Sequence, residues 1–175
     1  MTKILNDMIA SFLDYPDNES LAVCVVMIGC DNNCPGCQNP LLRNPEYSNG
    51  TREITKEDLV SEIILQCNRN MTNKVVLSGG DPLFPGNIET TKYILEKLGK
   101  THDICVYSGH DVNYAKLNGI KGFKFLKVGY YDQQNSRISR KDDYEIVFAS
   151  PNQELYDENY NLVSKDGIYE FKLKV

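Results

Sequence analysis

The feature that most restricts the fold is an apolar run that leads directly into a group of cysteines. Residues 21–28 are an unbroken apolar, β-rich run, which is typical of a strand buried on both faces. Cys30, Cys34 and Cys37 follow within eight positions, in the spacing C-x3-C-x2-C. The sequence therefore predicts a buried strand that ends in a loop with three thiols.

The rest of the chain alternates between strand-like and helix-like patterns. Thr55 is the expected N-cap of a helix whose apolar stripe runs from Leu59 to Cys67. The segment 152–175 is expected to form a hairpin, because Lys165-Asp166-Gly167 is a typical hairpin turn. Further strands are predicted at residues 74–78, 103–108, 123–128 and 144–149, and further helices at residues 88–98 and 112–117.

This order predicts an α/β fold with a mostly parallel sheet, in which ligands bind at the carboxyl ends of the strands. Four successive predicted strands end in glycine-bearing loops, which let a backbone approach a ligand closely. We expect these loops to lie at one edge of the sheet, beside the three thiols. They contain Gly29, Gly79-Gly80-Asp81, Ser108-Gly109 and Gly129.

Composition limits the class of protein. A chain of 175 residues is long enough for one domain with a core of its own. The net charge of −5 argues against a nucleic-acid partner bound through phosphates. The longest apolar run is far too short to span a membrane, and the N-terminus has no signal-peptide pattern. We therefore expect a cytoplasmic location, where clustered cysteines indicate metal binding or redox chemistry.

Three chemistries fit such a cysteine loop. A structural zinc site would need a fourth ligand, for which His102 and His110 are the candidates. Cys34 and Cys37 could form a dithiol redox pair, although Cys30 would then have no role. Three thiolates also suit a [4Fe–4S] cluster in which one iron stays open for a ligand. The other cysteines are expected to be small buried apolar residues: Cys24, Cys67 and Cys105.

The motifs resemble those of the radical S-adenosylmethionine superfamily. Within it, the chain is similar to the activating proteins of the anaerobic (class III) ribonucleoside-triphosphate reductase. The resemblance covers residues 22 to about 157 and rests mainly on GCDNNCPGCQNP at 29–40, LSGGDPLFP at 77–85 and VYSGHD at 106–111. KVGYY at 127–131 and SPNQELYD at 150–157 agree more loosely.

The resemblance implies a single domain over residues 1–175, with the superfamily's partial TIM-type βα barrel and a C-terminal hairpin. It implies that Cys30, Cys34 and Cys37 hold three irons of a [4Fe–4S] cluster, and that the amino and carboxylate groups of S-adenosylmethionine chelate the fourth. Gly79, Gly80 and Asp81 match the loop that receives the methionyl amino group. Ser108 matches a hydroxyl-bearing residue near the ribose. No side chain of the protein need act as a catalytic acid or base.

The implied activity is reductive. An electron from a flavodoxin or ferredoxin enters the cluster, and S-adenosylmethionine is cleaved to methionine and a 5′-deoxyadenosyl radical. The radical removes a hydrogen atom from a glycine Cα of the reductase. Close alternatives are a 7-carboxy-7-deazaguanine synthase or the activase of a different glycyl-radical enzyme. A non-enzymatic zinc or thiol-redox module is the alternative from another class.

Overall fold

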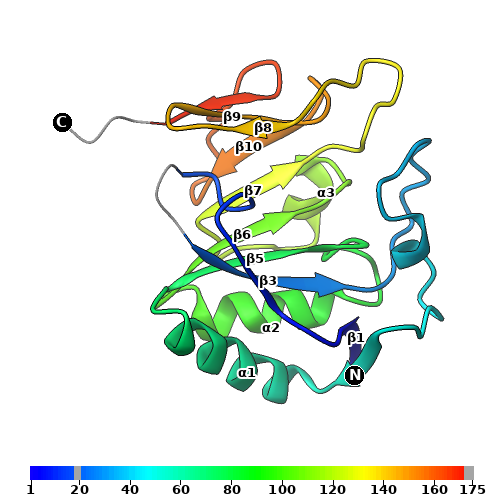
Figure 1. The fold of residues 1–175 in the computed structure, drawn as a ribbon, viewed down its shortest axis with the longest axis vertical. Coiled ribbons are helices and arrows are strands. Elements are labelled where there is room, and N and C mark those ends of the chain that lie inside the picture. Colours follow the sequence, from blue (N-terminus) through cyan, green and yellow to red (C-terminus); the bar gives the residue numbers. More distant parts are fainter. Residues whose placement is uncertain (18–20, 172–175) are drawn as a thin grey trace.

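The computed structural model describes residues 1–17 and 21–171. Its elements follow the predicted alternation of strands and helices, with additional short strands near both ends (Figure 1). In chain order they are β1 (Thr2–Leu5), β2 (Ile9–Ser11), β3 (Ala22–Met27), the 3₁₀ helix η1 (Pro40–Arg43), β4 (Thr51–Ile54), α1 (Lys56–Arg69), β5 (Lys74–Gly79), α2 (Ile88–Leu98), β6 (Asp103–Tyr107), α3 (Val112–Leu117), β7 (Phe125–Val128), β8 (Arg140–Lys141), β9 (Glu145–Val147), β10 (Glu154–Asp157) and β11 (Ile168–Glu170).

The main sheet has a parallel centre and antiparallel edges. Its strands follow the order β10-β7-β6-β5-β3-β1-β4, and β2 pairs with β3 outside this path. The pairs β3–β5, β5–β6 and β6–β7 are parallel, whereas β1, β4 and β10 pair antiparallel with their neighbours. The predicted α/β fold with a mostly parallel central sheet is thus confirmed. The strands β1, β2 and β4 were not predicted.

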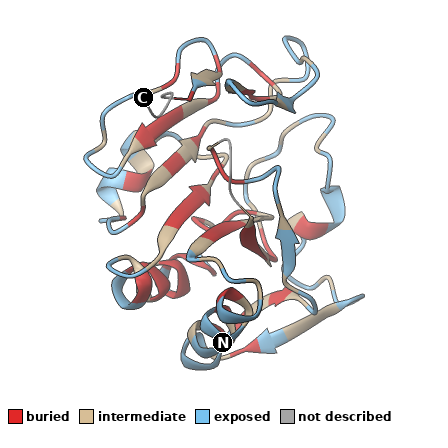
Figure 2. Cartoon of the chain, turned by 60° about the vertical axis from the view of Figure 1, so that its left-hand side comes forward, coloured by how far each residue is buried: buried red, intermediate tan, exposed pale blue. Residues whose placement is uncertain are grey.

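Helices α1 and α2 cover one face of this sheet (Figure 1). The side chain of Thr55 accepts the N–H of Asp58, so the predicted N-cap of α1 is confirmed. Leu59, Ile63 and Cys67 lie on the buried side of α1 and pack into the core. Figure 2 shows buried residues along the central strands and along the inner sides of the helices. Within the described residues, no helix combines the length and apolarity needed to cross a bilayer.

The opposite face of the sheet is covered by two smaller units. Tyr15, from the N-terminal segment, packs with Cys24 and Cys105 on β3 and β6. A second sheet, with strand order β11-β9-β8, packs through Phe148 and its neighbours against Leu155 of β10. The strand predicted at 144–149 therefore exists as β9, but it belongs to this second sheet.

The expected C-terminal hairpin is wrong in its pairing. The turn forms as predicted, with reciprocal backbone hydrogen bonds of 2.8 and 2.9 Å between Lys165 and Ile168. However, β10 pairs with β7 and β11 pairs with β9, so the two flanking strands lie in different sheets. The chain instead folds back on β10 earlier, where Tyr156 bridges to Leu162. The turn depends on local residues, but the strand partners were decided by apolar packing. Residues 172–175 of the predicted hairpin lie outside the described residues.

The buried side of α1 can be tested with two adjacent isoleucines. Ile63 is fully buried, whereas Ile64 is 37% exposed. We expect Ile63→Ala to lower the free energy of unfolding by about 2–5 kcal/mol, because it leaves a cavity beneath the sheet. The matched control Ile64→Ala should lower it by less than about 1 kcal/mol. Urea unfolding of both variants measures the difference, and equal losses would contradict this packing.

Candidate functional site

The parallel strands bring the predicted site residues to one edge of the sheet. The loop with the three cysteines follows β3, Gly79 ends β5, and Ser108 follows β6. Figure 1 shows the loop after β3 on the side toward which the arrowheads of β3 and β7 point. The ends of β3, β5, β6 and β7 with their following loops are called the carboxyl edge below.

Backbone contacts hold the ends of β3 and β5 together. The N–H groups of Gly80 and Asp81 donate to the carbonyls of Met27 and Gly29, both at 2.8 Å. A Cβ at Gly79, where φ is +115°, would lie 2.4 Å from the Met27 oxygen. A Cβ at Gly80 would lie 2.4 Å from the Gly29 oxygen. Close packing of β5 and its loop against the β3 backbone therefore explains why glycine stands at both positions, since any larger residue would clash. Their contact with a cofactor stays a prediction.

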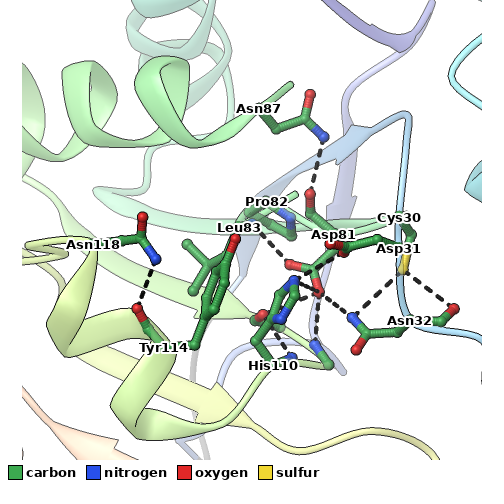
Figure 3. Close-up of polar contacts among 12 residues, drawn as sticks. Cys30, Asp31, Asn32, Asp81, Pro82, Leu83, Asn87, His110, Tyr114 and Asn118 are labelled. Atoms are coloured by element: carbon green, nitrogen blue, oxygen red, sulfur yellow. Dashed lines mark hydrogen bonds and ion pairs between the residues drawn. The ribbon is translucent and has the colours of Figure 1, made fainter. Parts of the chain in front are cut away.

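Asp81 is the centre of the hydrogen-bond network at the carboxyl edge (Figure 3). Its side chain is fully buried. Oδ1 accepts the N–H of Leu83 at 2.8 Å, and Oδ2 accepts the Asn32 amide at 2.8 Å. Oδ2 also accepts the Ser108 hydroxyl at 3.0 Å and the N–H of Gly109 at 2.9 Å. Burial raises the pKa of the Asp81 carboxyl, while the backbone hydrogen bonds from Leu83 and Gly109 oppose that rise.

This network ties three loops to one carboxylate. Asn32 belongs to the cysteine loop, whereas Ser108 and Gly109 follow β6. The Ser108 hydroxyl also accepts the N–H of His110 at 3.1 Å, so it is engaged both with Asp81 and with its own loop. The structure thus gives Asp81 and Ser108 positioning contacts within the chain. Their predicted contacts with a methionyl amino group and a ribose stay predictions.

Asn32 links the network to the first thiol. Its amide Nδ2 lies 2.8 Å from Asp81 Oδ2 and 3.6 Å from Cys30 Sγ. A Cβ at Gly109 would lie 2.6 Å from the same Nδ2, so a larger residue at this position would force the Asn32 side chain to shift. The amide can donate one hydrogen to the carboxylate and the other to the sulfur. Asn32 therefore fixes the direction in which the loop leaves β3.

The other two cysteines lie on a tight turn. The N–H of Cys37 donates to the carbonyl of Cys34 at 3.3 Å, across Pro35 and Gly36. Gly36 has φ +68°, the conformation that glycine adopts readily in the third position of such turns. The turn keeps the two sulfur-bearing residues on one compact stretch of backbone.

Arg43 supports the cysteine loop from η1. Its carbonyl accepts the N–H of Cys30 at 3.1 Å, and its Nη2 donates to Asn33 Oδ1 at 2.5 Å. Its Nε is buried and has no hydrogen-bond partner within the described residues. A buried donor without an acceptor costs about 1–3 kcal/mol. That donor fits a site whose acceptor arrives with a bound group.

His110 holds the loop from the β6 side. Its Nε2 lies 2.9 Å from Asp31 Oδ1, between Cys30 and Asn32 in sequence. Its ring stacks on Tyr114 of α3, with centroids 3.9 Å apart and planes 9° apart. His110 is therefore a neighbour of the cysteine loop, attached through Asp31.

The six cysteines fall into two groups. Cys30, Cys34 and Cys37 are partly exposed and free, whereas Cys24, Cys67 and Cys105 are free and buried, as predicted. Burial raises the pKa of the Cys24 thiol to about 12 and that of Cys67 to about 11. Burial also raises the pKa of Cys30. Only the first group combines access with a place at the carboxyl edge.

The donor set consists of three thiols on one loop. Cys30, Cys34 and Cys37 are free and partly exposed. Their number matches the three protein ligands of a [4Fe–4S] cluster that keeps one iron open.

Comparison with known proteins agrees with this donor set. Residues 19–155 match the family model described as a 4Fe-4S single cluster domain. The chain belongs to this 4Fe–4S single-cluster family. The family model spans the cysteine loop, the strands β3, β5, β6 and β7, and the first half of β10, so the cluster domain includes the whole carboxyl edge.

Curated relatives of this family member include bacterial activating proteins. The anaerobic ribonucleoside-triphosphate reductase-activating protein of Salmonella typhi is 30% identical over 135 residues, which cover 71% of this chain and 80% of the relative. The protein of the same name from Escherichia coli K12 is 26% identical over 133 residues, with the same coverage. The one from Haemophilus influenzae is 26% identical over 105 residues, which cover 57% of this chain and 65% of the relative.

Sequence reasoning did not assign roles to Asn32, Asp31 or Arg43. Asn32 and Asp31 stood inside the motif GCDNNCPGC, but a motif does not say which of its side chains turn toward another strand. Arg43 lies outside the motif, and only the fold brings its carbonyl to Cys30. These residues depend on contacts between segments that are distant in sequence.

The two groups of cysteines can be distinguished by labelling. In iron-free, reduced protein, we expect Cys34 and Cys37 to react rapidly with a maleimide at about pH 7.5, and Cys30 to react more slowly because burial raises its pKa. Cys24, Cys67 and Cys105 should react only after unfolding. The physical reason is access together with the burial-raised pKa of the second group. Mass spectrometry of digested protein identifies the labelled sites. Rapid labelling of a buried cysteine in folded protein would contradict the structure.

The Asp81 network can be tested by unfolding. Asp81→Asn replaces one acceptor oxygen by an amino group, which meets N–H or O–H donors in either orientation. We expect the free energy of unfolding of iron-free protein to fall by about 1–3 kcal/mol in urea. The control Asp143→Asn, at an exposed position, should change it by less than about 0.5 kcal/mol. Equal stability of the two variants would refute the network.

Proposed function

We propose that this protein activates an anaerobic ribonucleoside-triphosphate reductase by generating a glycyl radical on it. The observation that carries the proposal is the loop of three accessible thiols, fixed by Asn32 and Asp81 at the carboxyl edge of a 4Fe–4S single-cluster domain. The activating proteins among its relatives support the same reading.

Within this proposal, Cys30, Cys34 and Cys37 hold the cluster, and Gly79, Gly80, Asp81 and Ser108 form the side of the site that receives S-adenosylmethionine. The cluster and S-adenosylmethionine, when bound, would supply one-electron reductive cleavage of S-adenosylmethionine and a radical that removes a hydrogen atom from a glycine Cα. We further propose that residues 1–175 act as one domain, and that its parallel strands form part of a TIM-type barrel of the radical S-adenosylmethionine kind.

The chain's own residues position the cysteine loop. Asn32 keeps Cys30 turned toward the carboxyl edge, and the Cys34–Cys37 turn keeps the other two thiols close together. The buried Asp81 carboxylate holds the loops after β3 and β6 at fixed distances from each other. A site assembled in this way has little need to rearrange when its groups bind.

The exposed residues around the three thiols form the surface on which we place a partner protein. Residues on both sides of the thiols are exposed, including Asp31, Asn33, Pro35 and Gln38. A glycine on a second protein can therefore approach the loop from outside. We propose the glycyl-radical subunit of the reductase as that partner, and a flavodoxin or ferredoxin as the electron donor.

The test begins with anaerobic purification. We expect about four irons and four sulfides per chain by the cluster's stoichiometry, and an EPR signal of the dithionite-reduced protein that changes when S-adenosylmethionine is added. Mixing with the reductase should then give a glycyl-radical doublet. A protein that binds one zinc and does not respond to S-adenosylmethionine after reconstitution would overturn the proposal.

The assignment of the ligands has its own test. Cys30→Ala, Cys34→Ala and Cys37→Ala should each lose most of the iron and the whole glycyl-radical yield, since each removes one of three protein ligands. Cys67→Ala is the matched control, because Cys67 is a buried thiol on α1. It should retain full iron content. Full iron in any of the first three variants would refute the ligand set.

A further inference from the structure

Lys127 is a charged residue in an unusual place. On β7 the side chains alternate, and Leu126 and Val128 pack into the core under the helices. Phe125 and Lys127 therefore face the opposite side of the sheet. Lys127 stands beside Tyr107 in the parallel ladder with β6, two residues before Gly129 at the carboxyl edge. Its side chain thus lies on the face of the sheet opposite α1 and α2, which is called the inner face here, close to the carboxyl edge.

Two aromatic rings lie beside the Lys127 ammonium. The ammonium lies 5.7 Å from the centroids of the Tyr107 and Phe148 rings. Within the part of the chain that the structure describes, it makes no hydrogen bond or ion pair. The Asp81 carboxylate acts on it through space, but all four of that carboxylate's hydrogen bonds go elsewhere.

The side chains of Cys105 and Cys34 lie close enough to raise the pKa of this ammonium when their sulfurs are ionised. Burial lowers the pKa of Lys127 to about 8, and the nearby acidic groups oppose that decrease. Lys127 is half-buried, and a positive charge withdrawn from water in this way is costly unless negative charge lies close to it. Cys34 supplies such charge when it binds iron as a thiolate.

We propose that Lys127 is the counter-charge of the cluster held by the cysteine loop, and that it makes this cluster easier to reduce. The inference rests on the proposed function, in which Cys34 is a ligand. Reduction adds one negative charge to a group that three thiolates already make negative. A fixed positive charge in a half-buried position stabilises the reduced form more than the oxidised form.

The experiment measures the midpoint potential of the cluster in the full chain, by EPR-monitored redox titration without S-adenosylmethionine. Lys127→Gln and Lys127→Met remove the charge, whereas Lys127→Arg retains it. We expect both charge-removing variants to lower the equilibrium constant for reduction at least tenfold, which for a one-electron couple is a fall of about 59 mV. Lys127→Arg should stay near the wild-type potential.

Lys124→Gln is the matched control. Lys124 precedes β7, is 43% exposed and pairs with Glu158 at 2.9 Å, so removal of its charge should leave the potential unchanged. The iron and sulfide content of every variant verifies that a complete cluster is present. The iron content also separates the two hypotheses, because wild-type protein without a cluster would overturn the proposed function itself.

Three results would overturn the role of Lys127. The first is a wild-type potential in both charge-removing variants with full iron content. The second is the same shift in Lys127→Arg, which would indicate packing rather than charge. The third is an unchanged potential with weaker S-adenosylmethionine binding, measured by the EPR change on titration, which would assign Lys127 to the carboxylate of that molecule instead.

Discussion

The buried carboxylate of Asp81 is the interaction on which the rest of the site depends. It lies at the end of β5 and accepts hydrogen bonds from the loops after β3 and β6 and from its own loop. A buried carboxylate is costly unless its oxygens are satisfied, so the loops that supply the donors are held as firmly as the carboxylate itself. Because the buried carboxylate needs these donors, the cysteine loop is held in one position relative to β5.

The sheet makes this arrangement available. Parallel strands have their carboxyl ends at one edge, and α1 and α2 bury the face beneath them. The close approach of β3 to Gly79 and Gly80 draws the cysteine loop toward β5. The helices thus contribute stability, whereas the strand ends contribute position. This division leaves the loop itself free of core packing, with its three thiols accessible.

Radical chemistry on another protein sets two opposed requirements. The reacting groups must be kept from water, but a segment of the partner must still reach them. For the first, the chain places the buried side chains of Asp81 and Ser108 at the carboxyl edge. It meets the second with exposed residues around the thiols. Lys127 adds charge from the inner face, where aromatic rings surround its ammonium.

The sequence by itself determined the elements and the chemistry of the loop. Apolar periodicity and capping residues are local, and they located α1, α2 and the parallel strands; α2 occupies the predicted residues 88–98. The cysteine spacing identified the three accessible thiols. Tertiary structure decided the pairing of β10 and β11, the presence of the antiparallel strands β1, β2 and β4, and the contacts of Asn32 and Arg43. The physical reason is that strand pairing and burial of charge depend on segments distant in sequence, about which local patterns carry no information.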